Sequence, residues 1–182
     1  YDTSAKLTTR FNDRNRLSVS YYHGSDNLDL RLPFDLSLDF SSWLRPTDLF
    51  FEVDQSWSNR MVSAQYHGVL SPSVVLNATG YYSGYRARES SFVRPTTAAS
   101  LTSDYAVSVD DVGLKGAVDL YASMAHQWKV GGQVAHLAFS SMLDSQIRRT
   151  VTSTETQSQA TNRRAVKVSG FAQHTWMPTP RL

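Results

Sequence analysis

Hydrophobic and polar residues alternate with a period of two over seven stretches of this 182-residue chain. In the clearest stretch, 112–122, valine, leucine, glycine and alanine fill the even positions, while lysine, aspartate and tyrosine stand among the odd ones. A period of two is that of a β-strand whose two faces meet different surroundings. The other six stretches are residues 5–11, 16–23, 59–70, 74–84, 128–136 and 166–176. Since no stretch keeps a helical period, the chain is predicted to be all-β.

Short turns and long connections alternate between these stretches. Clusters of asparagine, aspartate, proline or serine predict tight turns at residues 12–15, 71–73, 123–126 and 178–180. Between the turns we expect three long irregular connections, at residues 24–58, 86–108 and 140–163. Short turns at one end and long loops at the other are typical of outer-membrane barrels. The pattern therefore predicts a segment of an antiparallel transmembrane β-barrel, with about seven strands.

Aromatic residues gather toward the ends of the predicted strands. Tyr21 and Tyr82 stand just before long connections, whereas Trp128 and Trp176 stand beside short turns. Amphipathic rings favour the headgroup level of a membrane. We therefore expect these four residues at the two membrane interfaces. The alternative interpretation makes them core aromatics of a soluble β-sandwich or adhesin domain.

Composition narrows the class of protein. The net charge is only +2, which argues against a nucleic-acid-binding protein, since such a protein needs a basic stripe to neutralise phosphates. The chain has no cysteine, which excludes disulfides, thiolate metal sites and cysteine nucleophiles. Its apolar runs are too short for a membrane-spanning helix, but alternating strands leave no such run.

Candidate catalytic and metal-binding chemistry is sparse. The five histidines share no motif, and no Gly-x-Ser-x-Gly nucleophile elbow occurs. His23 could bind a metal ion together with Asp26 and Asp29, but a solvated acidic loop is the favoured interpretation. We therefore expect no enzymatic activity, no catalytic or metal-binding residue and no cofactor, and the sequence identifies no substrate-binding residue.

Two polar sets are candidates for a functional role. The first is the polar side of the alternating stretches, which is expected to face a barrel lumen and to hydrogen-bond a plug; it comprises Lys6, Arg10, Arg16, Lys115, Asp119, Lys129, Gln133 and Lys167. The second is the segment 146–164, which contains two arginine pairs, Arg148-Arg149 and Arg163-Arg164. If the strands extend above the membrane, these pairs would face each other near lipopolysaccharide phosphates. Solvated strand ends are the alternative.

Three stretches resemble the barrel of TonB-dependent outer-membrane receptors. Residues 171–182 read Phe-Ala-Gln-His-Thr-Trp-Met-Pro-Thr-Pro-Arg-Leu. They resemble a segment of that family in which aromatic-x-Gln-Asp-x-Trp leads through a periplasmic turn into Arg-Leu, with His174 in place of the usual aspartate. Residues 7–18 and 126–132 resemble other hairpin segments of the same family. The similarity is to the large receptors that carry a carboxypeptidase-regulatory-like domain before the plug.

The resemblance implies a barrel of about 22 strands, closed around a plug and used for energy-coupled nutrient uptake. At about 55 residues per hairpin such a barrel needs roughly 600 residues. Residues 1–182 are therefore expected to be part of a single outer-membrane barrel domain, without the plug and the N-terminal domains. The chain also begins at Tyr1 without a leader, and we interpret it as a piece of a longer protein.

The same resemblance implies the partners and the location. Expected partners are the rest of the barrel and its plug, an inner-membrane energy-coupling complex, outer-membrane lipid and lipopolysaccharide, and a surface lipoprotein. Nucleic acid is not expected. The expected location is the outer membrane of a Gram-negative bacterium. A passive porin or small eight-stranded barrel and a soluble β-sandwich or adhesin domain stay open as alternatives, and the transported substrate is not indicated.

Overall fold

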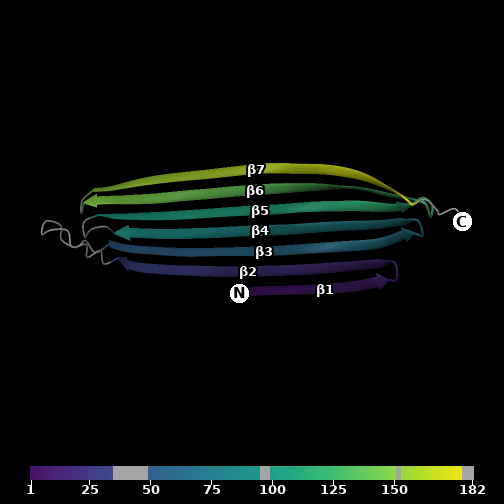
Figure 1. The fold of residues 1–182 in the computed structure, drawn as a ribbon, viewed down its shortest axis with the longest axis horizontal. Coiled ribbons are helices and arrows are strands. Elements are labelled where there is room, and N and C mark those ends of the chain that lie inside the picture. Colours follow the sequence, from purple (N-terminus) through teal and green to yellow (C-terminus); the bar gives the residue numbers. More distant parts are fainter. Residues whose placement is uncertain (35–48, 95–98, 151–152, 178–182) are drawn as a thin grey trace.

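The computed structural model describes residues 1–34, 49–94, 99–150 and 153–177. These residues form one antiparallel sheet whose strands pair in sequence order (Figure 1). The strands are β1 (Asp2–Asn12), β2 (Asn15–Phe34), β3 (Leu49–Ser71), β4 (Val74–Arg94), β5 (Ser100–Tyr121), β6 (His126–Thr150) and β7 (Ser153–Trp176). The prediction of an all-β antiparallel fold is confirmed. Across the described ranges, no helix is long and apolar enough to cross a membrane.

Three of the predicted short turns are confirmed, and all three lie at one end of the sheet (Figure 1). In the first turn, Asn12 Oδ1 accepts hydrogen bonds from the Arg14 backbone N–H at 2.9 Å and from Asn15 Nδ2 at 2.8 Å. Ser71 Oγ accepts from the Ser73 N–H in the second turn, as Ser123 Oγ does from the His126 N–H in the third. These side chains fold back on nearby backbone groups, as turn residues do. The fourth turn, 178–180, lies outside the described residues.

The strands are much longer than the alternating stretches indicate. Strands β2 to β7 have 20–25 residues each, about twice the ~10 residues that cross a bilayer. The expected irregular connections at 24–58, 86–108 and 140–163 are therefore wrong wherever these segments are described. Asn27 pairs with Ser56 and Arg88 pairs with Ala106, deep inside two of them. Ladders of backbone hydrogen bonds define the strand pairing. Here the ladders continue beyond the alternating stretches from which the strands were predicted.

The pairing register assigns each strand residue to one of two faces. We call face A the one that carries Val112 and Leu114, and face B the one that carries Gly113 and Lys115. Over the half of the sheet nearest the short turns, the turn half, face A is aliphatic. Its residues include Leu17, Val19, Val62, Ala64, Leu76, Ala78, Leu114, Val118, Val130, Val134, Val166 and Val168. Face B is polar over the same half.

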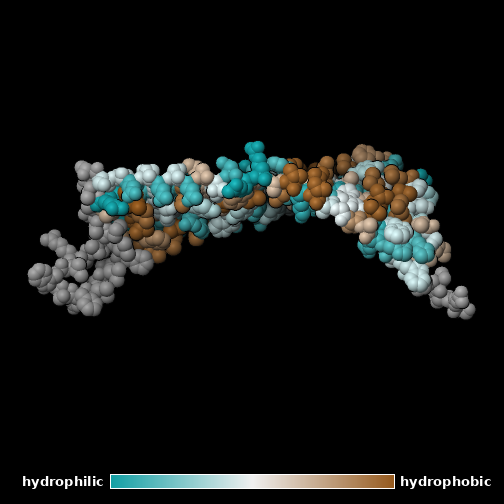
Figure 2. All heavy atoms as spheres, turned by 90° about the horizontal axis from the view of Figure 1, so that it is seen from above, coloured by the Kyte–Doolittle hydropathy of each residue, from teal (hydrophilic) through white to brown (hydrophobic). Residues whose placement is uncertain are grey.

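The polarity of the two faces inverts in the other half of the sheet, the far half. In β2 the apolar residues stand at odd positions up to Tyr21 and at even positions from Leu28 onward. Face A of the far half carries serine, asparagine, arginine and aspartate, while face B carries Leu28, Leu30, Leu32, Phe51, Val53, Trp57, Tyr85, Leu101, Tyr105, Val107, Phe139, Leu143 and Ile147. Figure 2 views the sheet along its edge and shows hydrophobic atoms on opposite faces at the two ends.

The sheet has almost no core of its own. Ala135, which is 2% exposed, is the one buried hydrophobic residue in the described part of the chain. Leu114 is 63% exposed on face A, and Leu28 is 47% exposed on face B. Apolar surfaces of this extent are normally covered by a partner, a ligand or lipid. Each half of the sheet therefore offers one apolar face to something outside these strands.

Tyrosine rings fill the space above several glycines. A Cβ on Gly24, Gly68, Gly84 or Gly113 would lie 2.5–2.7 Å from a tyrosine hydroxyl oxygen. In the first three the tyrosine stands two residues earlier on the same strand, whereas Tyr81 reaches Gly113 from the neighbouring strand. A ring laid over a glycine supplies packing that the missing side chain cannot.

At Gly131 on face B, the nearest neighbour is a backbone atom and not the end of a side chain. A Cβ there would lie 2.6 Å from the Gly116 carbonyl oxygen and 2.7 Å from the Phe171 ring. A side chain at this position would therefore collide with the neighbouring strand. Gly116, on the neighbouring strand and on face A, has open space where its Cβ would be.

We expect Gly131→Ala to destabilise the folded protein by about 1–3 kcal/mol, because the backbone oxygen cannot move aside as a side chain can. The matched control Gly116→Ala is expected to stay within about 0.5 kcal/mol of wild type. Urea unfolding of the full-length protein in detergent, followed by tryptophan fluorescence, measures both. Equal losses in the two variants would contradict the steric explanation.

Candidate functional site

The four aromatic residues singled out from the sequence all lie on face A. Tyr21 and Tyr82 share one cross-strand row, the tyrosine row: Tyr21, Val62, Tyr82, Val112, His136 and Val166. Trp128 lies in a second row near the short turns with Val74, Leu120 and His174, and Trp176 lies one row further. Tyr21 and Tyr82 stand in the middle of their strands, because the strands continue past the expected ends.

The two aromatic rows enclose the aliphatic part of face A. Along β4 they are eight residues apart, from Val74 to Tyr82, a distance of about 27 Å at 3.4 Å per residue. At a strand tilt of about 40° this corresponds to about 20 Å along a barrel axis. That height approaches the ~25 Å apolar band of outer-membrane barrels. The dimensions and the aromatic borders together suit the hydrocarbon core of a membrane.

Histidine and tryptophan side chains stack at the turn end of face A. The rings of Trp128 and His174 have centroids 4.2 Å apart, and His174 Nε2 lies 3.0 Å from His126 Nδ1. His174 is the residue that replaces the aspartate of the resembled motif. Its ring joins the interstrand contact between β6 and β7 at this end.

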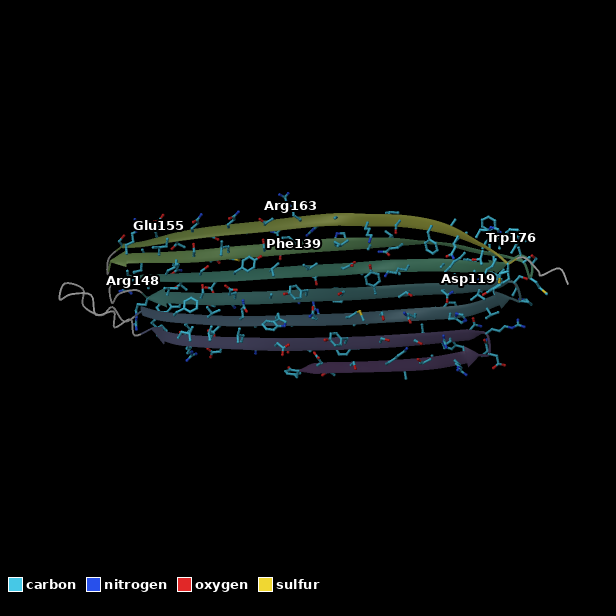
Figure 3. The ribbon with its side chains drawn as sticks, in the orientation of Figure 1. Asp119, Phe139, Arg148, Glu155, Arg163 and Trp176 are labelled. Atoms are coloured by element: carbon cyan, nitrogen blue, oxygen red, sulfur yellow. The ribbon has the colours of Figure 1, made fainter. Side chains whose placement is uncertain are left out.

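All eight polar residues expected to face a lumen lie on face B. The structure brings two of them together, since Lys129 Nζ lies 3.5 Å from Asp119 Oδ1. Asn77 Nδ2 donates to Asp119 Oδ2 at 3.1 Å, and His67 lies 2.8 Å from Asn77 Oδ1. The Asp119 side chain is 12% exposed, which makes this group the most enclosed ion pair of the described sheet. Figure 3 shows Asp119 near the turn end.

The remaining members of that polar set are spread over face B. Arg10 pairs directly with Arg16 across the β1–β2 hairpin, and Lys115 pairs with Gln133. Lys115 Nζ also lies 4.9 Å from the centroid of the Tyr81 ring, a cation–π contact. Like charges directly opposite each other are unfavourable without a counter-charge. The Arg10–Arg16 pair is therefore suited to an anionic group supplied from outside this sheet.

An arginine-rich surface on face A is not anticipated by the sequence patterns. Arg60 and Arg86 both approach Asp110, at 4.0 and 3.7 Å, and Tyr82 donates a hydrogen bond to Asp110. Arg60 also donates to the Tyr82 hydroxyl at 2.6 Å. These residues belong to β3, β4 and β5, so only the pairing register reveals that they are neighbours. Continuing the period-two pattern past Tyr82 would have placed them on one face.

The hypothetical metal site at His23, Asp26 and Asp29 is wrong. His23 and Asp29 lie on face A six positions apart, and Asp26 lies on face B. Instead, carboxylate oxygens of Asp29, Glu52 and Asp54 lie within 4.8 Å of one another. Arg31 Nε contacts Asp29 at 3.2 Å and Glu52 at 2.9 Å, so a guanidinium already neutralises part of this group.

The two arginine pairs of segment 146–164 do not face each other. Arg148 pairs with Thr154, whereas Arg163 pairs with Phe139 and Arg164 with Ala138. Figure 3 shows Arg148 at the far end of the sheet and Arg163 nearer its middle. Arg149 instead contacts Glu155 at 3.2 Å. Strand β6 ends at Thr150 and β7 begins at Ser153, and the register between them separates the two arginine pairs along the strands.

Comparison with known proteins identifies the fold alone. No family model matches the chain, and no curated protein matches it. Among solved structures, the ferric yersiniabactin uptake receptor FyuA from Yersinia pestis matches with a TM-score of 0.67 and 13% sequence identity. The match covers 98% of this chain but 26% of that receptor's chain, so this chain spans about a quarter of it.

The likeness extends over the whole sheet. It shows an antiparallel β-sheet that resembles part of a receptor barrel.

We expect Asp119→Ala to destabilise the folded protein by about 1–2 kcal/mol, because Asn77 and Lys129 lose their shared acceptor in a partly enclosed place. Asp111→Ala, on the same strand and face, is the control: within the described residues, Asp111 accepts only from the Tyr81 hydroxyl, at 3.3 Å or more. Urea unfolding midpoints of the two full-length variants compare them. If Asp111→Ala lowers the stability as much as Asp119→Ala does, the contacts of Asp119 with Asn77 and Lys129 are not the cause of the loss.

Proposed function

We propose that this chain is part of the barrel wall of a TonB-dependent outer-membrane receptor that imports a nutrient by energy-coupled transport. The observation that carries the proposal is the inversion of polarity at the tyrosine row. A membrane-spanning barrel has lipid outside and water inside, whereas its extension above the membrane has water outside. The two halves of the sheet have the two polarities that these surroundings require. The likeness to an uptake receptor supports the same function.

In this proposal, face A of the turn half meets lipid hydrocarbon and face B lines the lumen. Between the short turns and the tyrosine row, face B carries six basic residues, Lys6, Arg10, Arg16, Lys115, Lys129 and Lys167. Asp119 is the one acidic residue in the same part of the described face, so six positive charges stand against one negative charge. A plug that presents carboxylates to this wall would balance the difference.

The apolar part of face B in the far half lines the entrance to the lumen in this proposal. Trp57, Tyr85, Tyr105, Phe139 and Leu143 are each 37–42% exposed in the isolated sheet. Inside a closed barrel they would meet other strands, the plug or a passing ligand. A soluble β-sandwich does not need this arrangement, because its strands keep one apolar face along their whole length.

The edges of the sheet favour a larger barrel over a complete small one. Strand β1 pairs only with β2, and β7 only with β6, among the described strands. An unpaired strand edge in hydrocarbon costs several kcal/mol per backbone group. Further strands of the same barrel, including one beside β1 and one beside β7, would satisfy these groups.

The proposed topology can be tested by labelling, since the chain contains no cysteine. Thr154→Cys at the far end is expected to react with a membrane-impermeant maleimide on intact cells, because the far half stands outside the cell. Asp13→Cys in a short turn is expected to react only after the outer membrane is permeabilised. Labelling of both residues, or of neither, on intact cells would contradict the orientation.

Energy coupling separates the proposed receptor from a passive porin. We compare nutrient uptake that is lost when the gene for this protein is deleted. This uptake is expected to fall about tenfold or more when a protonophore dissipates the inner-membrane proton gradient, or when the energy-coupling complex is deleted. A porin admits its solutes by diffusion through an open channel, so uptake unaffected by either treatment would favour the porin. The matched control is a known porin of the same strain.

A further inference from the structure

Two histidine side chains meet at the turn end of face A. His126 begins β6 and His174 stands near the end of β7, so they are 48 positions apart and share no sequence motif. The β6–β7 register brings them together, since His126 pairs with Trp176, the residue two positions after His174. Figure 3 shows Trp176 at this end of the sheet. Both histidine side chains are exposed, so their nitrogens are accessible to ions in solution.

The contact between the two rings joins one nitrogen of each. His126 Nδ1 lies 3.0 Å from His174 Nε2, and the two ring planes differ by 9°. A neutral imidazole carries one N–H, so one of these nitrogens donates a hydrogen bond and the other accepts it. When the donor ring takes its other tautomer, its proton sits on the nitrogen that points away from the contact. Both facing nitrogens then present a lone pair, and the pair can act as two ligands for one cation.

The distance between the two nitrogens suits a metal ion bound by both. Imidazole nitrogens bind divalent transition metals at about 2.0–2.1 Å. At that bond length, two nitrogens at a right angle are about 2.9 Å apart, whereas two corners of a tetrahedron are about 3.3 Å apart. The observed 3.0 Å is closer to the right angle. Right-angled coordination is that of Cu²⁺ or Ni²⁺, and Cu²⁺ binds most tightly in the divalent series.

Trp128 orders one of the two ligands. Its ring stacks on the His174 ring, with centroids 4.2 Å apart. A side chain that is already ordered loses less entropy when it binds a ligand. His174 also stands where the resembled receptor segment has an aspartate. The pair of imidazoles is therefore a feature of this chain and not of the resembled motif.

The other coordination positions of such an ion are open to water. Among the residues that the structure describes, no third histidine or carboxylate completes a group of three with this pair. Sites with open positions bind water or an exchangeable ligand there, in contrast to the closed four-ligand sites of structural zinc. In the proposed barrel, this end of face A lies on the periplasmic side, where dissolved metal ions reach it.

We propose that His126 and His174 form a binding site for a divalent transition-metal ion, with Cu²⁺ as the preferred ion. The bound ion ties the first residue of β6 to the end of β7, which closes a loop of about 48 residues. Cross-links that close long loops restrict the unfolded chain strongly, so the ion is expected to stabilise this hairpin. The inference does not rest on the proposed function, because it requires only the β6–β7 register.

The test adds Cu²⁺ to the full-length protein, purified in detergent without a polyhistidine tag. Electron paramagnetic resonance is expected to show a tetragonal Cu²⁺ signal with splitting from two imidazole nitrogens. By titration calorimetry, His126→Asn and His174→Asn are each expected to bind Cu²⁺ at least about tenfold more weakly than wild type. Cu²⁺ is also expected to raise the urea midpoint of wild type and to leave that of both variants unchanged, because only a bound ion stabilises the folded state.

His136→Asn is the matched control, because His136 lies on the same face of β6 but in the tyrosine row. It is expected to bind Cu²⁺ as wild type does, and heat-modifiable migration on gels verifies that every variant is folded. Equal binding by wild type and both ligand variants would mean that Cu²⁺ binds elsewhere, which overturns the proposal. Absence of binding by wild type, or tighter binding of Zn²⁺ than of Cu²⁺, would overturn it as well. Uptake that does not depend on energy would refute the proposed function and leave this inference standing.

Discussion

Hydrogen bonds between neighbouring backbones hold this structure together, because its side chains form almost no core. Ala135 is the one buried hydrophobic residue of the described sheet, yet every strand from β3 to β6 is paired along both of its edges. An antiparallel ladder satisfies N–H and C=O groups without help from water, which is the condition for a strand to lie in hydrocarbon. Side chains are consequently free to suit whatever each face meets.

That freedom is used differently in the two halves of the sheet. In the turn half the apolar side chains project from face A, and the polar ones, such as Asp119 and Lys129, project from face B. In the far half the assignment is reversed, with Trp57 and Phe139 on face B and Arg86 on face A. The tyrosine row marks the change. One continuous ladder thus carries both polarities, as the proposed membrane wall and outer vestibule require.

The sequence predicts the turn half well and the far half poorly. Alternation around Val112 and Leu114 is clear because small aliphatic residues oppose lysine and aspartate. Around Leu28 and Leu30 the alternation is just as regular, but its phase has changed, and charged residues such as Asp29 suggest a loop. Cross-strand groups such as Arg60 with Asp110 could not be predicted, because their proximity depends on registers between strands that the sequence does not specify.

The strand order β1 to β7 follows the chain without a crossover. Each strand therefore pairs with the strand that precedes it in the sequence, so the pairing contacts are local and do not depend on a distant part of the chain. Such a sheet can be assembled as a succession of hairpins, with each finished edge acting as the template for the next. Sequential assembly also has a cost. A register slip of one residue in one hairpin turns its apolar residues to the wrong face, and every strand that pairs afterwards inherits the shifted register.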